Sequence, residues 1–285
     1  MNSRAVHVVV VAYDAPNQLA RSLAGLDRQL STTVVDNSSS AEVASVATRF
    51  DADYVDTGAN LGFAAGVNVA LNRLARTDSD VLLLNPDALI VPAAVAELER
   101  FLHCPGHERM GAVAPRLLGP EDVVHRVLWP FPTPGRMWAE AFGFGRVTVR
   151  GTFAVGAVLL LRREAIEDVG TFDERFFLYA EETDWQRRAR DRGWTSAVCE
   201  SAVAEHAGAG TSTDRVRREK LFHAAQETYI RKWHGGGGWL LYRVAACLGG
   251  GIRTLALTRA RRRQAALRTI LYLRGPRRCA TKELK

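Results

Sequence analysis

Short runs of β-branched and aliphatic residues alternate with segments of helical periodicity in the N-terminal part of the chain, and this alternation limits the fold more than any other feature. The expected strands are Val8–Ala12, Thr32–Val35, Tyr54–Asp56 and Val81–Leu84. The expected helices are Asn17–Leu26, Ala41–Phe50, Gly62–Arg73 and Pro92–Leu102. Strands alternating with helices predict βαβ units, and therefore an α/β fold with a mostly parallel sheet flanked by helices.

The rest of the sequence predicts a less regular middle and a helical end. Residues Gly111–Arg150 are rich in Pro, Gly, Trp and Phe, and we expect strands with loops that could line an acceptor pocket. An apolar strand is expected at Phe153–Leu161, and a helix at Glu181–Arg192 that Gly193 terminates. A further helix is expected at Arg215–Trp233.

Charge is distributed unevenly along the chain. Residues 1–209 contain 20 Lys and Arg against 27 Asp and Glu, whereas residues 210–285 contain 18 against 4. Such asymmetry indicates a body that binds or catalyses and a basic extension that meets an anionic partner. We therefore divide the chain into a catalytic domain, residues 1–212, and a basic, partly amphipathic helical extension, residues 213–285.

The cysteines and the N-terminal sequence favour a cytoplasmic protein. The four cysteines are scattered, without C-x-x-C pairs or metal-ligand spacing, as expected of reduced thiols. The apolar run Val6–Ala12 is too short for the core of a signal peptide, so we expect no secretion signal.

Polar clusters follow predicted strands at Asp36-Asn37-Ser38, Asn60-Leu61-Gly62 and Asn85-Pro86-Asp87. Because ligands of open α/β sheets bind at the carboxyl ends of strands, the three clusters together predict a binding site. The Asp87 carboxylate could hold a hard divalent cation that neutralises a diphosphate, although Pro and Asp are also common turn residues.

Two of these clusters have alternative interpretations. Asp36 could accept hydrogen bonds from a base or ribose, or it could cap the helix that begins at Ala41 together with the intervening serines. Gly62 and Gly66 could let backbone N–H groups approach an anion, or they could allow tight helix packing.

Three carboxylates, Glu181, Glu182 and Asp184, crowd the first turn of a predicted helix. Mutual repulsion raises the pKa of at least one of them, which suits a general base. The alternatives are stabilisation by the helix dipole and an i,i+4 ion pair between Asp184 and Arg188. His206 follows a predicted strand end and becomes a candidate metal ligand only if Asp87 is one.

The order of motifs resembles the family 2 glycosyltransferases of the GT-A fold, in particular the rhamnosyltransferase-like branch. The matching segments are VVVVAYD (Val8–Asp14), VVDNSS (Val34–Ser39), NLGFAAGVN (Asn60–Asn68), LLLNPD (Leu82–Asp87), VAPRLL (Val113–Leu118), the stretch Gly156–Arg188 that includes FDERFFLYAEETD, and EHAGAGTS (Glu205–Ser212). The resemblance covers roughly residues 6–212 and keeps its order throughout.

The resemblance implies roles for individual residues. Donor-binding positions would be Tyr13, Asp36, Asn60, Gly62, Asn68 and Asn85. Asp87 and His206 would bind Mg²⁺ or Mn²⁺. Glu182, with Asp184 in the same acidic motif, would deprotonate the acceptor hydroxyl in an inverting reaction, while the metal stabilises the departing diphosphate.

The chain departs from the family pattern at four positions. Asn85 replaces the first Asp of the D-x-D motif, and Glu182 stands where the family base is usually Asp. Ala12 occupies a position that is often Asn, and Glu205 a position where a second His is frequent. None removes a required role, but they leave the exact metal ligands open.

The basic extension contains an apolar segment, Trp239–Leu257, about as long as a transmembrane helix. Arg243, Arg253 and three consecutive glycines argue against a simple span, and favour a segment in the membrane interface with its arginines towards lipid phosphates. The alternative is packing on the catalytic domain with solvated arginines.

These observations predict transfer of a sugar, with rhamnose suggested by the branch, from a dTDP- or UDP-sugar to a glycan or lipid-linked acceptor in cell-surface polysaccharide synthesis. The enzyme would act at the cytoplasmic face of the membrane. The alternative is a non-catalytic, basic membrane- or nucleic-acid-binding protein with a transferase-like body. A dinucleotide-dependent oxidoreductase is disfavoured because no G-x-G-x-x-G follows the first strand.

Overall fold

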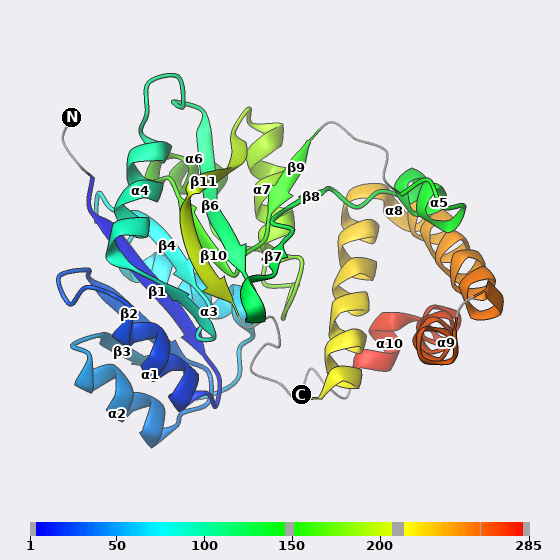
Figure 1. Cartoon of the computed structure of the whole chain (residues 1–285), viewed down its shortest axis with the longest axis horizontal. Coiled ribbons are helices and arrows are strands. Elements are labelled where there is room, and N and C mark those ends of the chain that lie inside the picture. Colours follow the sequence, from blue (N-terminus) through cyan, green and yellow to red (C-terminus); the bar gives the residue numbers. More distant parts are fainter. Residues whose placement is uncertain (1–3, 146–150, 207–213, 257, 282–285) are drawn as a thin grey trace. The chain divides into compact units, whose positions relative to one another are not determined.

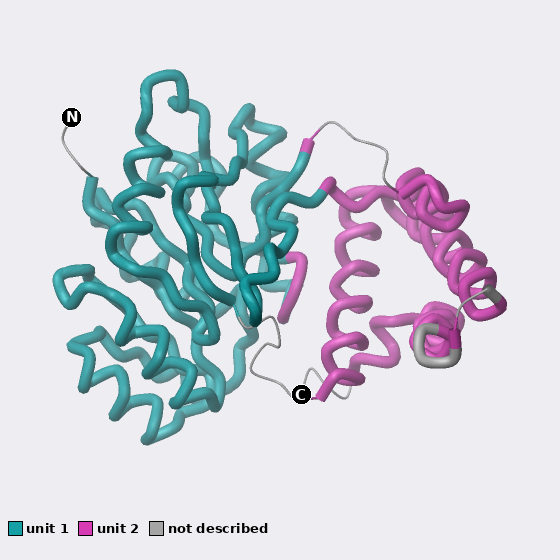
Figure 2. The backbone as a smooth tube through the Cα atoms, viewed as in Figure 1, with its two compact units in different colours: residues 1–129, 152–177, 181–213 teal, residues 130–151, 178–180, 214–285 magenta. Residues whose placement is uncertain are grey.

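The computed structural model describes residues 4–145, 151–206, 214–256 and 258–281, and the chain forms two compact units (Figure 2). Unit 1 comprises residues 1–129, 152–177 and 181–213; unit 2 comprises residues 130–151, 178–180 and 214–285. The expected boundary at residues 212 and 213 lies outside the described residues. Residues 130–151, assigned from the sequence to the first domain, belong to unit 2.

Unit 1 is built on one large, mostly parallel sheet, as expected (Figure 1). Its strands are β1 (Val6–Ala12), β2 (Thr32–Asp36), β3 (Asp53–Asp56), β4 (Asp80–Leu84), β5 (Ala88–Ile90), β6 (Met110–Leu118), β7 (Val124–His125), β10 (Val158–Leu161) and β11 (Thr195–His206). Their order is β3-β2-β1-β4-β10-β6-β11-β5, with β7 paired to β6. The first four are parallel to one another, and so are β6 and β11.

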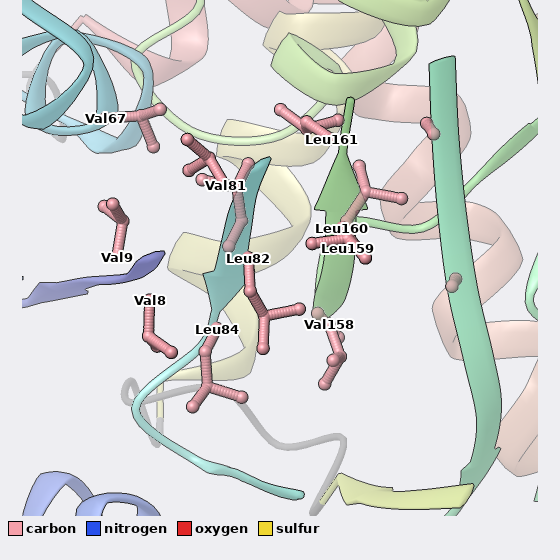
Figure 3. Packing of buried hydrophobic residues seen from close by; sticks show 14 of the residues in the cluster. Val8, Val9, Val67, Val81, Leu82, Leu84, Val158, Leu159, Leu160 and Leu161 are labelled. Atoms are coloured by element: carbon pink, nitrogen blue, oxygen red, sulfur yellow. The ribbon is translucent and has the colours of Figure 1, made fainter. Parts of the chain in front are cut away.

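The centre of the sheet is aliphatic on both faces. Val8 and Leu82 are neighbours across β1 and β4, and Leu82 lies opposite Leu160 across β4 and β10. All three side chains are fully buried, and Val67 of α3 (Phe63–Arg73) lies over the same strands (Figure 3). The burial of these aliphatic side chains is the main source of the stability of unit 1. Because the core is closely packed, it holds the ends of the strands rigidly in place.

Helices pack against the sheet at positions set by short connections. They are α1 (Pro16–Ala24), α2 (Ala41–Arg49), α3, α4 (Pro92–Leu102), α6 (Arg163–Val169) and α7 (Glu181–Asp191). Helix α3 contacts β1 and β2, and α4 contacts β6 and β11 (Figure 1). Pro92 occupies the first turn of α4, where its missing N–H costs no hydrogen bond. Gly193 follows α7 with a φ of 85°, as its predicted terminating role requires.

The predicted strand Phe153–Leu161 is two strands. Residues 155–157 separate β9 (Thr152–Ala154), which pairs with β8 (Leu128–Pro130), from β10. Strand β10 runs antiparallel to both β4 and β6. A strand buried on both faces is apolar in whichever direction it runs, so the pattern could not reveal its orientation.

The middle stretch contains a helix that the sequence did not predict, α5 (Pro134–Ala141). The hydroxyl of Thr133 accepts a hydrogen bond from the Arg136 N–H (3.1 Å), and Pro134 occupies the first helical position. These are ordinary start signals. The surrounding glycines and aromatics, which suggested loops, concealed them.

Unit 2 contains α5, α8 (Arg215–Ala256), α9 (Arg259–Arg274) and α10 (Pro276–Ala280). Helix α8 breaks at Gly235, whose φ of 66° is not helical. Trp239, Tyr242 and Tyr272 form the aromatic centre, with ring centroids 6.0–6.2 Å apart. No described helix is both long enough and apolar enough to span a bilayer.

The two arginines of the apolar segment have roles inside unit 2. Arg243 donates to the carbonyl oxygens of Tyr272 and Leu273, each at 2.7 Å. Arg253 donates to the Glu140 carbonyl oxygen at 2.7 Å. These donors satisfy free carbonyls of α9 and α5, a role inside unit 2 that the sequence did not predict, and a contact of the same arginines with lipid phosphates stays a prediction.

Candidate active site

Two polar loops meet beside the carboxyl ends of β1 and β2. Tyr13 and Asp14 follow β1, and residues 38–40 follow the adjacent parallel strand β2. With Asn37 and residues 58–60 they line an open depression of about 550 Å³. Tyr13 is 41% exposed, so its ring is available to a ligand. Of the predicted donor-binding residues, Tyr13 and Asn60 thus lie together here.

Asp36 is placed beneath this depression, with its carboxylate fully buried. One oxygen accepts from the N–H (2.8 Å) and hydroxyl (2.5 Å) of Ser38, and the other from the Ser40 N–H (2.8 Å) and the Tyr54 hydroxyl (2.9 Å). Ser40 caps α2. Asp36 thus organises the loop through these four hydrogen bonds, whereas the helix cap suggested as the alternative is made by Ser40 and not by Asp36 itself.

Gly62 begins α3 at a point where the chain crosses another loop. Its φ is 83°, and a Cβ there would lie 2.4 Å from the Phe177 carbonyl oxygen. The Asn60 side chain accepts from the Gly62 N–H (3.1 Å), and the Asn37 amide donates to the Gly62 carbonyl (2.9 Å). Glycine is required here by both conformation and space.

Asn68 joins α3 to the loop at residues 172–174. Its amide donates to the Phe172 carbonyl and the Glu174 carboxylate, each at 2.9 Å, and its oxygen accepts from the Phe172 N–H at 2.8 Å. The side chain is 4% exposed. Asn68 thus contributes to the site by positioning this loop.

Asp87 and His206 lie side by side although they are far apart in the sequence. His206 pairs with Ala88 across β11 and β5, and its Nε2 is 3.4 Å from the Asp87 carboxylate. The two side chains are 18% and 5% exposed, and Asp87 Oδ2 is buried without a hydrogen-bond partner among the residues that the structure describes. They border a cavity of about 260 Å³ that Gln18 and Arg21 of α1 also line.

This pair fits a divalent metal. A buried carboxylate oxygen without a partner is costly, and a cation would satisfy it. Carboxylate and imidazole both suit Mn²⁺, and a carboxylate with few other protein ligands suits Mg²⁺. The described residues contain no cluster of three or more acidic, His or Cys ligands, so a bound ion would take its other ligands from water or from the nucleotide.

Glu182 approaches the same edge of the sheet through the loop before β10. The Gly156 N–H donates to its carboxylate, and a Cβ on Gly156 would lie 3.3 Å from Glu182 Cγ. The next residue, Ala157, accepts from the Asn85 N–H at 2.9 Å. Glu182 is therefore connected to the Asn85-Pro86-Asp87 turn by two hydrogen bonds, through Gly156 and Ala157. No described residue hydrogen bonds to the Asn85 side chain.

Burial raises the pKa of both Glu181 and Glu182. The charge of Glu182 raises the pKa of Glu181 further, and each has a buried Oε2 to which no described residue donates a hydrogen bond. A raised pKa makes Glu182 a stronger base once it is ionised. The sequence predicted this crowding, but burial is the larger cause.

Asp184, the third carboxylate of the acidic motif, has a different role from Glu181 and Glu182. Its carboxylate is fully buried and accepts from Arg188 Nε at 3.1 Å. Arg188 also donates to the Val169 (2.9 Å) and Thr171 (2.7 Å) carbonyls. The i,i+4 ion pair considered from the sequence is present, and it ties α7 to the segment that follows α6.

Replacement of Glu181 by Gln is expected to raise the Tm near neutral pH and to leave it unchanged at about pH 4. Since the folded-state pKa is raised, the folded protein binds more protons than the unfolded chain above the ordinary pKa of 4.5, and the free energy of unfolding falls as pH rises through that window. Thermal unfolding across this range measures the difference, with exposed Glu200→Gln as the control. A Tm difference independent of pH would contradict the buried-carboxylate argument.

The comparisons with known proteins were decisive for the family. Residues 3–228 match the family described as glycosyltransferase like family 2. The chain belongs to this glycosyltransferase family.

Relatives and solved structures agree with this family assignment. The chain is 30% identical over 264 residues, covering 80% of it and 85% of the relative, to N-acetylglucosaminyl-diphospho-decaprenol L-rhamnosyltransferase of Mycobacterium tuberculosis. It is 26% identical over 211 residues, covering 70% of it and 66% of the relative, to the low-salt glycan biosynthesis hexosyltransferase Agl10 of Haloferax volcanii. These names match the rhamnosyltransferase-like branch.

Two solved structures share the fold of this chain. Glucosyl-3-phosphoglycerate synthase from Mycobacterium tuberculosis, solved with Mn²⁺ and UDP-glucose, has a TM-score of 0.54 at 16% identity, covering 80% of this chain and 79% of that one. TarS 1-349 from S. aureus has a TM-score of 0.52 at 13% identity, covering 98% of this chain and 92% of that one.

The sequence analysis of this glycosyltransferase did not single out two residues, His125 and Arg116. His125 of β7 meets His206 edge-on, with ring centroids 6.5 Å apart, and its ring fills the space beside Gly119. Arg116 of β6 has a buried Nε without a partner, opposite Val203 in β11. Arg116 lies in a quoted motif, but His125 had no local signal, because only the β6–β7 hairpin brings it to His206.

Proposed function

We propose that this glycosyltransferase moves a sugar, with rhamnose as the first candidate, from a dTDP- or UDP-sugar to a hydroxyl of a lipid-linked acceptor, with inversion at the anomeric carbon. The observation that carries the proposal is the buried Oδ2 of Asp87 beside His206, which has no hydrogen-bond partner in the described part of the chain. Glu182 approaches this pair through the hydrogen bonds of Gly156 and Ala157. The name of the mycobacterial relative supports both the sugar and the lipid link.

The donor would bind along the carboxyl edge of the sheet. Its base and ribose would occupy the depression lined by Tyr13 and Asn60, and its diphosphate would extend towards Asp87. Asp87 and His206 would hold Mg²⁺ or Mn²⁺, which neutralises the charge that develops on the leaving diphosphate. The complex of the similarly folded glucosyl-3-phosphoglycerate synthase with Mn²⁺ and UDP-glucose supports this arrangement.

Glu182 would act as the general base. Its carboxylate would accept the proton of the acceptor hydroxyl as that oxygen attacks the anomeric carbon from the face opposite the diphosphate. The Gly156 N–H holds the carboxylate in place, and the dry surroundings that raise its pKa also keep bulk water from competing for the sugar. Asp184 would act only by positioning α7 through Arg188.

The pathway would be cell-surface polysaccharide or glycoconjugate synthesis at the cytoplasmic face of the membrane. A lipid-linked acceptor is confined to that surface, and the basic extension, residues 213–285, would keep the enzyme there. The alternative without catalysis gives no reason for a buried, unpartnered carboxylate at the end of β4.

The proposal predicts that one nucleoside diphosphate stabilises the protein in a metal-dependent manner. At a hundredfold excess over Kd, a ligand specific to the folded state adds about 2.7 kcal/mol to the free energy of unfolding. Thermal unfolding with UDP, dTDP or GDP, each with and without Mn²⁺, should show this for the wild type. Asp87→Ala should lose the metal-dependent part.

The exposed carboxylate Glu200 provides the matched control, because Glu200→Ala removes the same charge from unit 1. That variant should keep the full nucleotide shift. Turnover of dTDP-rhamnose and UDP-sugars by the same proteins then identifies the donor. An Asp87→Ala protein that equals the wild type in both assays would remove the basis of the proposal.

A further inference from the structure

The hairpin of β6 and β7 brings His125 to the face of the sheet that also carries His206. His125 pairs with Leu117 across the hairpin, and Leu117 pairs with Ala204 of β11. Because residues that pair across neighbouring strands point to the same face, these three side chains form a row. His206 lies two residues beyond Ala204 along β11, so it points to that face as well. The two imidazole rings therefore lie on one side of the sheet.

Gly119 leaves the space through which the His125 ring reaches His206. The last paired residues of β6 and β11 are Leu118 and Glu205. The residues that follow them, Gly119 and His206, therefore lie level with each other. A Cβ on Gly119 would lie 2.2 Å from His125 Nε2, so the imidazole fills the volume that a side chain here would take. The φ of Gly119 is −89°, which any residue can adopt, so the glycine is required for space alone.

The two rings make an edge-to-face contact. Their centroids are 6.5 Å apart and their planes meet at 88°. This arrangement is favoured between aromatic rings, because the positive edge of one ring meets the negative face of the other. The Nε2 atom of the same His206 ring lies 3.4 Å from the Asp87 carboxylate. The contact with His125 therefore acts on the ring that faces the proposed metal site.

Packing against His125 supplies an orientation that a hydrogen bond commonly gives to a metal-binding histidine. Such a histidine ordinarily donates its second ring N–H to a carboxylate or a backbone carbonyl, which fixes the ring. No described residue forms a hydrogen bond with Nδ1 of His206. His125 is not a further ligand in this arrangement, since the described residues contain no group of three or more His, Cys, Asp or Glu side chains that could hold an ion. His125 thus acts on a bound ion through His206.

We propose that His125 is a positioning residue that holds the His206 ring with Nε2 towards a divalent cation at Asp87. Gly119 makes room for this contact. The inference rests on the metal site of the proposed function. It predicts that His125 and Gly119 set the affinity for the cation, and that neither takes part in the transfer step at Glu182.

The test follows thermal unfolding while Mn²⁺ is titrated at saturating UDP, and again at saturating dTDP. His125→Ala should raise the Mn²⁺ concentration that gives half of the stabilisation about 3- to 10-fold, the range that one aromatic pair contributes. His125→Phe should restore the wild-type value, because a phenyl ring keeps the edge-to-face contact. In the transfer assay, kcat of both variants at saturating Mn²⁺ should stay within about twofold of the wild type, since Glu182 is unchanged.

A matched control is His107→Ala. It removes another imidazole of unit 1, which packs on Phe101 with ring centroids 4.7 Å apart and precedes β6 at its other end. This variant should keep the wild-type Mn²⁺ dependence, whatever its effect on the Tm without ligand.

Gly119→Ala tests the contact without changing either histidine. Its methyl group takes the place of the His125 ring, so this variant should raise the half-effect Mn²⁺ concentration as much as His125→Ala does. In the His125→Ala background the same substitution should add nothing, because the ring that it displaces is absent. Gly135→Ala is the control, since no atom lies within 4 Å of its Cβ position.

The outcomes separate this inference from the proposed function. A wild-type Mn²⁺ dependence in His125→Ala, or a failure of His125→Phe to restore it, would overturn the positioning role. Additive effects of Gly119→Ala and His125→Ala would also overturn it, because the two substitutions would then act independently. A wild type that neither nucleotide stabilises in a Mn²⁺-dependent manner would remove the metal site of the proposed function, and this inference with it.

Discussion

Glu182→Gln is expected to lower kcat by about 10²- to 10⁴-fold while leaving donor binding unchanged, since that is the usual contribution of a general base. The substitution keeps the size and the contact with Gly156, but an amide cannot accept the proton of the acceptor hydroxyl. The proposed donor site includes Tyr13 and Asp87, and the substitution changes neither side chain. Steady-state kinetics and nucleotide-dependent thermal stabilisation measure the two properties separately.

The pH dependence of the same variant distinguishes a base from a residue with only a structural role. Burial raises the pKa of Glu182, so wild-type kcat/KM should fall as the pH is lowered through that raised value. The variant should lack this acidic limb. Glu200→Gln is the control for loss of one carboxylate and should keep both rate and profile. A variant within threefold of the wild-type rate, with the acidic limb intact, would assign the base to another residue.

Gly62→Ala is expected to lower the free energy of unfolding by about 2–5 kcal/mol. About 1–2 kcal/mol comes from a side chain at positive φ, and about 1–3 kcal/mol from forcing a methyl group into a filled space. The φ of Gly62 is 83° and the new Cβ would lie 2.4 Å from the Phe177 carbonyl oxygen, a backbone atom that cannot rotate away. Denaturant unfolding measures the loss.

Gly58→Ala is a close control for this prediction. Gly58 has a similar φ of 70° and no atom within 4 Å of its Cβ position. Its substitution should therefore cost only the conformational part, about 1–2 kcal/mol. Because Asn60 lines the depression proposed for the donor and accepts a hydrogen bond from the Gly62 N–H, Gly62→Ala should also weaken nucleotide binding. Equal losses of stability in the two variants would show that the crossing with Phe177 is not tight.

Much of the first unit follows from local sequence. The Val- and Leu-rich composition of β1 and β4 predicted buried strands, and Pro92 and Gly193 predicted where helices begin and end. The polar residues at strand ends predicted that their loops meet, as they do around the depression lined by Tyr13 and Asn60, because all parallel strands present their carboxyl ends at one edge. The antiparallel direction of β10 was missed, since an apolar run has no direction.

The candidate site was also predicted only in part from the sequence. Local sequence indicated Asp87 and Glu182, but not the state of their neighbours. Asp36 looked available to a ligand, and folding surrounded it with four hydrogen bonds. Asp184 had two interpretations, and the position of Arg188 favours the ion pair. His125 became a neighbour of His206 only through a hairpin with no local signal for it.

The sequence by itself determined the class of the fold, the family, and the edge of the sheet at which chemistry is expected. Periodicity and strand-end composition are local properties, and folding does not change them. Only the tertiary structure decided which polar groups remain without partners and which arginines remain free. Those outcomes depend on contacts between residues far apart in the chain, such as Asp87 with His206 and Arg243 with α9. A buried polar group forms a hydrogen bond with whichever partner the fold places nearby. The local sequence around that group does not determine which partner this is.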